Sequence, residues 1–310
     1  MSKRDFRNVS DFSTEEIRQV FRMASELKRE VPTKRFTPRL KGKVLAMIFE
    51  KPSLRTRCTF EIAMIQMGGS AIYLGPSEIG LGTRESVYDV AKNLERWFDL
   101  VMVRTFAQDN IEQLARHCAL PVINALSDRA HPCQAMADFF TILEKRGSLD
   151  GFRLAYLGDG NNICNSLIEV SARLGCEIRV AGPREYMPPE DVLERAQAEA
   201  ARTGARILVT TDPAEALDGA EAIYTDVWAS MGQEAEADRR REIFLPYQLN
   251  VAMARHARPG AWIMHDLPAH RGEEITDDVL DSPRAIIFDQ AENRLHVQKA
   301  IMVFLDELRG

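Results

Sequence analysis

Cysteine is scarce in this sequence, and the few cysteines that occur are widely scattered. There are five of them, an odd number, at positions 58, 118, 133, 164 and 176. No two form a Cys-x-x-Cys pair, so neither a zinc knuckle nor a disulfide framework is indicated. We therefore expect reduced thiols and a cytoplasmic protein.

Long apolar runs and an excess of positive charge are also absent. No uninterrupted apolar segment approaches the roughly 18 residues that span a membrane, and the first five residues, MSKRD, lack the apolar core of a signal peptide. The formal net charge is -6, which argues against nucleic acid as the main partner. A local basic pocket for an anionic small molecule stays compatible with this balance.

What the sequence does contain is a regular alternation of apolar runs with helical stretches. This alternation predicts an α/β fold in which parallel sheets carry helices on both faces, and a length of 310 residues favours two domains. Glycine, serine and aspartate at 147–151 mark the turn between the halves. We expect domains at 1–147 and 148–292, followed by a C-terminal helix within 293–310. The expected strands are 44–49, 71–74, 100–104, 121–126, 153–157, 177–180, 206–209, 222–225 and 261–264.

The turn after the first expected strand carries two hydroxyls and two guanidinium groups. Pro52 ends the strand, and Ser53 stands where a helix N-cap would stand. Backbone N–H groups and the positive end of the helix dipole favour an anion there, and Arg55 and Arg57 add charge that suits phosphate. The turn alone is equally compatible with solvated arginines at a helix start.

Other polar residues also follow expected strands, where ligands of parallel sheets collect. Arg104 is buried by its context and needs an anionic partner. His131 begins a helix, and Gln134 lies one turn further on. Asp226 and Asp266 are either solvated loop carboxylates or together face a cationic amine. Gly158-Asp159-Gly160 lacks the third glycine of a dinucleotide fingerprint, because position 163 is isoleucine.

These residues together resemble the aspartate/ornithine carbamoyltransferase family over nearly the whole chain. Each motif is weak alone, whereas their order and separation are specific, and the Ser-Met-Gly motif favours ornithine over aspartate as the acceptor. The resembling segments are 53–57 (SLRTR), Arg104, 131–134 (HPCQ), 158–162 (GDGNN), Asp226 with 230–232 (SMG), 265–268 (HDLP) and 292–294 (ENR).

The resemblance implies carbamoyl transfer from carbamoyl phosphate to the δ-amine of L-ornithine, which gives L-citrulline and phosphate in arginine metabolism. It implies no metal and no organic cofactor. Arg55, Arg104, His131, Asp226 and Asp266 are the implied catalytic residues. The implied carbamoyl phosphate ligands are Ser53, Leu54 through its N–H, Arg55, Thr56, Arg104, His131, Gln134 and Arg294, and the implied ornithine ligands are Asn162, Asp226, Ser230, Met231, Asp266 and Leu267.

The resemblance also implies an assembly. The family forms a homotrimer, or a multiple of trimers, with active sites shared between subunits and a loop at 75–86 that reaches into a neighbour's site. Two domains close on binding, and the C-terminal helix packs back on the first domain. No nucleic acid or membrane partner is implied.

Three positions depart from the family pattern. Asp266 replaces the usual cysteine beside the acceptor amine, where a carboxylate would raise the amine pKa or share a proton with Asp226. The usual loop glutamine has either Glu78 or Gly80 in its place, and Leu54 replaces a threonine. Two alternatives therefore stay open: a carbamoyltransferase for another amine or amino acid, and a catalytically silent metabolite-binding paralogue.

Overall fold

The structure, a computed structural model, describes residues 3–229 and 234–309. Its contacts divide the chain into two compact units. Unit 1 comprises Met1–Phe140 and Ala291–Gly310, and unit 2 comprises Thr141–Gln290. In the described part of the chain, no helix is both long enough and apolar enough to cross a membrane.

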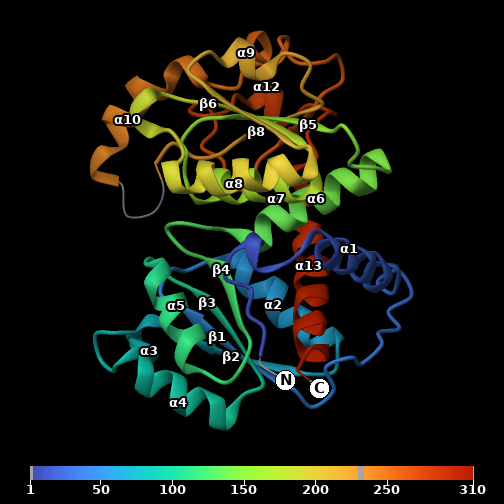
Figure 1. Cartoon of the computed structure of the whole chain (residues 1–310), viewed down its shortest axis with the longest axis vertical. Helices are drawn as coiled ribbons and strands as arrows, with labels where there is room; N and C mark the ends of the chain where they lie inside the picture. The colour runs from blue at the N-terminus through green and yellow to red at the C-terminus, as the bar shows by residue number, and fades with distance from the viewer. Residues whose placement is uncertain (1–2, 230–233, 310) are drawn as a thin grey trace. The chain divides into compact units, whose positions relative to one another are not determined.

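Unit 1 is a four-stranded parallel sheet with helices on both faces (Figure 1). The strand order is β2-β1-β3-β4. β2 is added on one side of β1, and β3 and β4 are added on the other side, so the strand order reverses between β1 and β3. The strands are β1 (Val44–Phe49), β2 (Ser70–Leu74), β3 (Leu100–Arg104) and β4 (Val122–Leu126). The helices are α1 (Thr14–Arg29), α2 (Leu54–Gln66), α3 (Pro76–Ile79), α4 (Val87–Trp97), α5 (Gln108–His117), most of α6 (Pro132–Arg146) and most of α13 (Ile287–Glu307).

Buried apolar residues explain how these helices cover the sheet. Ala46, Ile48 and Val101 on one face pack in a single cluster with residues of α4 and α5, such as Val90 and Leu114. Burial of such side chains contributes roughly 1.5–3 kcal/mol each. The two α/β units confirm the fold class that the alternation predicts.

Unit 2 is a five-stranded parallel sheet in the order β7-β6-β5-β8-β9. Here the reversal lies between β5 and β8, while α7 and α8 cover one face and α9 and α12 the other (Figure 1). The strands are β5 (Arg153–Leu157), β6 (Glu177–Ala181), β7 (Arg206–Thr210), β8 (Ala222–Thr225) and β9 (Trp262–Met264). The helices are α7 (Asn162–Leu174), α8 (Glu190–Thr203), α9 (Pro213–Leu217), α10 (Ala237–Phe244), α11 (Val251–Ala254) and α12 (Asp277–Leu280).

Two local features differ from the sequence-based expectation. The C-terminal helix begins at Ile287 rather than near residue 293, because no proline or glycine interrupts the chain between these positions. The loop at 75–86 contains one short helix, α3, which Pro76 opens and Gly80 ends in the left-handed conformation at φ 45°.

Candidate functional site

The first polar cluster lies in unit 1, where the strand order reverses between β1 and β3. Ligands of open α/β sheets bind at such switch points, beside the carboxyl ends of the strands. Ser53 follows β1 and caps α2, because its side chain accepts a hydrogen bond from the Thr56 N–H. Arg104 is the last residue of β3 and pairs in register with Phe49 at the end of β1. The sheet topology therefore brings two predicted anion-binding segments to one edge.

Thr56 is the centre of this cluster and is fully buried. The hydroxyl of Ser53 donates to Thr56 Oγ1 at 3.1 Å, and Nη2 of Arg294 donates to the same oxygen at 2.8 Å. Two donors on one hydroxyl oxygen leave its proton available for donation elsewhere. Arg294 comes from α13, so the C-terminal helix supplies one cation to a site built on the first strands.

His131 lies among three guanidinium groups at the start of α6. Burial, followed by the positive charges of Arg294, Arg104 and Arg55, lowers the pKa of His131 well below its usual value of 6.5. The imidazole is therefore neutral at pH 7 and carries one N–H donor. We call Arg55, Arg104 and Arg294 with His131 the cationic cluster. It combines charge for an anion with a neutral donor for a carbonyl oxygen.

Gln134 has an amide whose orientation the structure fixes. Its Nε2 donates to Oδ1 of Asp138 at 2.8 Å, and a carboxylate can only accept, so Oε1 is the atom on the other side. Gln134 is fully buried, and its Oε1 has no hydrogen-bond partner among the described residues. Such a buried acceptor costs free energy unless a ligand donor satisfies it. An N–H of a bound ligand suits this position.

In the turn after β1, the side chains of two residues lie outside the cationic cluster. The side chain of Leu54 is 77 % exposed, so only its backbone N–H is placed for an anion. The guanidinium group of Arg57 lies 4.4 Å from the centre of the Tyr73 ring, in a cation–π contact. Cys133, two residues after His131, is a packed thiol, because it is buried and donates to the carbonyl oxygen of Asn124.

The second polar cluster lies in unit 2, at the switch point between β5 and β8. Asn161 follows β5 and Asp226 follows β8, and Nδ2 of Asn161 donates to Oδ2 of Asp226 at 2.7 Å. Asp226 is buried. Asn162, the predicted ligand in this motif, is the first residue of α7. Ser230 and Met231 lie outside the described residues.

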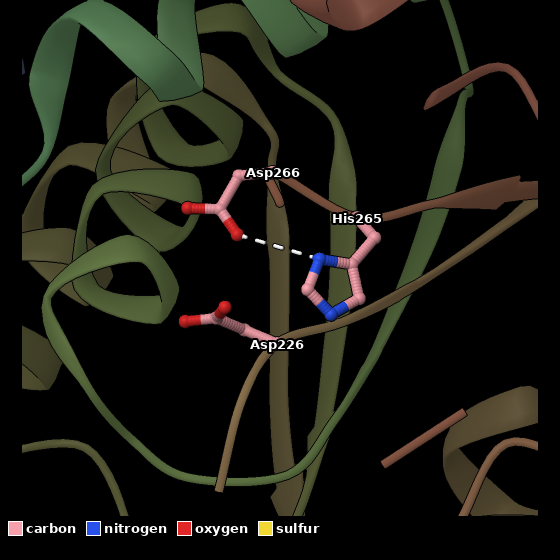
Figure 2. Close-up of side chains that lie close together, drawn as sticks. All are labelled: Asp226, His265 and Asp266. Atoms are coloured by element: carbon pink, nitrogen blue, oxygen red, sulfur yellow. Dashed lines mark ion pairs between the residues drawn. The ribbon is translucent and has the colours of Figure 1, made fainter. Parts of the chain in front are cut away.

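His265, Asp266 and Leu267 follow β9, the strand beside β8. Figure 2 shows Asp226, His265 and Asp266 with their side chains pointing toward one another, and we call these three the carboxylate cluster. One side-chain atom from each of the three lies within 4.8 Å of the others. The structure therefore brings Asp226 and Asp266 together. The sequence left open whether these two residues are separate solvated carboxylates or a pair that faces a cationic amine, and the second alternative requires this proximity.

The hydrogen bonds of His265 show why this cluster does not fit a metal ion. Nδ1 accepts a hydrogen bond from the Leu267 N–H at 2.9 Å, and Nε2 lies 3.1 Å from Oε1 of Glu274. The proton therefore belongs on Nε2, where it is donated to the carboxylate. The Nδ1 lone pair, which a cation would need, is already engaged. The same contact fixes Leu267, whose φ is 61°.

Sequence reasoning missed one buried charge beside this cluster. Arg240 of α10 donates to Asp159 and to the carbonyl oxygen of Trp228, and it is only 3 % exposed. Burial raises the pKa of Asp159 to about 6, although Arg240 opposes the rise. Arg240 stands between two further arginines in a polar helix, and no local pattern indicates which of the three is buried.

Comparison with known proteins covers both units. Residues 4–144 match the family model described as aspartate/ornithine carbamoyltransferase, carbamoyl-P binding domain, and residues 150–305 match its Asp/Orn binding domain. An ornithine carbamoyltransferase of Anoxybacillus flavithermus is 48% identical over 97% of this chain and 96% of its own length.

Two solved structures are similar along the whole chain. The ornithine carbamoyltransferase from Pyrococcus furiosus has a TM-score of 0.94 at 47% identity and covers 97% of this chain and 96% of its own. The anabolic ornithine carbamoyltransferase from Campylobacter jejuni has a TM-score of 0.93 at 38% identity and covers 99% of this chain and 100% of its own. With both domain models matched and such relatives aligned end to end, the chain belongs to the aspartate/ornithine carbamoyltransferase family.

Proposed function

We propose that this protein is an ornithine carbamoyltransferase, which transfers the carbamoyl group of carbamoyl phosphate to the δ-amine of L-ornithine and releases L-citrulline and phosphate. The observation that carries the proposal is the pair of complementary clusters at the two switch points. Unit 1 offers three guanidinium groups around a neutral imidazole, and unit 2 offers two carboxylates. One set suits an anionic acyl donor and the other a cationic amine.

The phosphate group of carbamoyl phosphate would bind at the start of α2. Ser53, the N–H of Leu54 and Thr56 supply donors at the positive end of the helix. Arg55 and Arg104 supply charge and bidentate hydrogen bonds, which the phosphate needs before and after transfer. The position of the Thr56 hydroxyl supports this role, because Ser53 and Arg294 occupy its oxygen and leave its proton to the ligand.

The carbamoyl group itself would be held by His131 and Gln134. A neutral imidazole N–H donates to the carbonyl oxygen, and Arg104 with Thr56 strengthens this polarisation as negative charge develops on that oxygen. The buried Oε1 of Gln134 would accept from the carbamoyl nitrogen. Arg294 adds a further cation beside the developing charge. These groups stabilise the transition state more than the ground state, because the oxygen gains charge only on attack.

The acceptor would bind in unit 2. Asp226 and Asp266 would face the side-chain amine of ornithine, and Leu267 would contact it through its backbone. Asn162, Asp226, Ser230 and Met231 would hold the α-amino and α-carboxylate groups. The carboxylate cluster supports a cationic acceptor.

The chemical step needs the δ-amine in its neutral form. Its lone pair attacks the carbonyl carbon, a tetrahedral intermediate forms, and the bond from carbon to the phosphate oxygen breaks with its electron pair going to phosphate. The proton lost by nitrogen passes to the leaving phosphate or to solvent. Because carbamoyl phosphate is already an activated acyl donor, positioning and preorganised charge supply the acceleration.

The proposal includes a homotrimer, or a multiple of it, in a reducing, cytoplasmic setting. The side chains of Ile62 and Ile65 on α2 support an interface, because they are 42% and 64% exposed on a single chain. The loop at 75–86 would reach a neighbouring subunit's site. Gly80 has no side chain to offer and its φ is 45°, so Glu78 is the better replacement for the family glutamine. All five cysteines are free thiols, which supports a reducing compartment.

One assay separates the three functional alternatives. Purified protein is supplied with carbamoyl phosphate and either ornithine, lysine, putrescine, N-acetylornithine or aspartate, and phosphate release is measured. We expect release with ornithine. Release only with another acceptor would establish a carbamoyltransferase of different specificity, and no release with any acceptor would establish a silent paralogue.

A further inference from the structure

We propose that Asn161 is a positioning residue that orients Asp226 toward the acceptor amine. Asn161 is not one of the proposed ligands of either substrate. The inference rests on the proposed function and adds to it. Asn161 combines two tasks in one amide, because it caps helix α7 with its oxygen and holds the Asp226 carboxylate with its nitrogen.

The oxygen side of the amide belongs to the helix. Oδ1 of Asn161 accepts hydrogen bonds from the backbone N–H groups of Ile163 and Cys164, both at 3.1 Å. The hydroxyl of Tyr156 lies 3.3 Å from the same oxygen. An amide whose oxygen faces these donors has its NH2 group directed the other way, so its orientation is fixed by the start of α7.

The nitrogen side of the amide faces Asp226. Nδ2 donates to Oδ2 of this buried carboxylate at 2.7 Å, a short distance typical of a hydrogen bond to a charged group. Asp226 follows β8, whereas Asn161 follows β5, so the bond spans the switch point of the unit 2 sheet. It commits one carboxylate oxygen and leaves the second for the acceptor.

A neutral donor is what this position requires. A lysine or arginine would also hold Asp226, but its charge would compete with the substrate ammonium group for the same carboxylate. An amide donor stabilises the ionised form and keeps its full negative charge. Within residues 3–229 and 234–309, the other titratable or charged groups around Asp226 are Asp266 and His265 after β9, Asp159 after β5 with Arg240 of α10, Tyr156 of β5 and Cys164 of α7.

Two substitutions separate the capping task from the positioning task. Asn161→Ser and Asn161→Asp both keep an oxygen that can cap α7, and both remove the Nδ2 donor to Asp226: aspartate has no donor when ionised, and the serine hydroxyl sits on a side chain that is shorter by one bond. Asn161→Asp additionally places a second carboxylate within hydrogen-bond distance of Asp226. A matched control is Asn250→Asp, because Asn250 caps α11 through a 3.0 Å bond from the Met253 N–H and has no role in either cluster.

We expect both variants of Asn161 to melt within a few degrees of the wild type and to keep the KM for carbamoyl phosphate. Their KM for ornithine should rise about ten- to a hundredfold, with a smaller change in kcat, since a hydrogen bond to a charged group is lost. In Asn161→Asp the acid limb of kcat should also move to higher pH by about one unit, because the new carboxylate raises the pKa of the bound amine. Asn250→Asp should change none of these kinetic values.

An unchanged KM for ornithine in both folded variants would overturn the role of Asn161 while leaving the proposed function intact. A wild-type protein that releases no phosphate with any acceptor would instead refute the proposed function, and the positioning role with it. If an amine other than ornithine is the acceptor, KM is measured for that amine. An unchanged KM in both folded variants would again overturn the role of Asn161.

Discussion

Asp266 stands where the family resemblance leads us to expect a cysteine, and its replacement gives the sharpest prediction. A carboxylate oxygen of Asp266 lies within 4.8 Å of one from Asp226. A bound δ-ammonium group would therefore interact with two negative charges instead of one. Since the amine must lose its proton before it attacks, the extra charge should delay that loss to higher pH.

The magnitude follows from Coulomb's law at this separation. With an effective dielectric constant of about 25 to 50, a unit charge about 4.8 Å from the ammonium group contributes roughly 1.4 to 2.8 kcal/mol, which corresponds to about 1 to 2 pH units. We expect the acid limb of kcat to lie about 1 to 2 pH units higher in the wild type than in Asp266→Cys. Asp266→Asn, which cannot titrate, should behave like the cysteine variant at its acid limb.

The assay is phosphate release with carbamoyl phosphate and ornithine both saturating, measured from about pH 6.5 to pH 10, so that the rate is kcat and reports the groups of the bound complex. Superimposable profiles for the wild type and both variants would show that the side chain of Asp266 does not raise the pKa of the bound amine. They would indicate that Asp226 and Asp266 share a proton and carry only one negative charge between them.

Three further predictions concern other parts of the molecule. Gln134→Met should lower kcat/KM for carbamoyl phosphate about a hundredfold in steady-state assays, because the carbamoyl nitrogen loses its acceptor; an unchanged value would remove Gln134 from the site. Lys299 is buried on α13 and its pKa is lowered to about 8, chiefly by burial. Because this folded-state pKa lies below the unfolded one of 10.5, the cost of burying the charge is complete below pH 8 and disappears between about pH 8 and 10.5. Lys299→Met should therefore raise the free energy of unfolding by about 1 to 2 kcal/mol at pH 7 and by less at pH 10, as urea titrations at the two pH values would measure; an equal gain at both would contradict the linkage. Ile65→Lys should dissociate the proposed trimer into monomers in sedimentation velocity, since it places a charge in the proposed α2 interface; a trimer that persists in this variant would place the interface elsewhere.

The sequence is most informative where local chemistry decides the structure. Ser53 could be recognised as a helix cap because proline and an apolar strand precede it, and the structure confirms the cap. The expected strands all form, because their apolar runs are bounded by turns. The strand order of each sheet determines which strand ends come together at the switch point. No single segment of the sequence indicates this order.

Long-range partners are the part that the sequence does not reveal. Asn161 and Asn162 are adjacent and chemically identical, yet only the fold shows that Asn161 contacts Asp226. Arg240 becomes a buried partner of Asp159 through packing of α10. Ile65 is apolar and helical, and the sequence alone does not show that it faces outward.

On this one protein, a carbamoyl donor held by guanidinium groups should react with an amine held by carboxylates. The direct test supplies carbamoyl phosphate labelled with carbon-13 at its carbonyl and unlabelled ornithine, and follows the products by NMR and mass spectrometry. We expect the label in the ureido carbon of citrulline, with one phosphate released for each citrulline formed. Phosphate release without labelled citrulline, or no reaction at all, would contradict it.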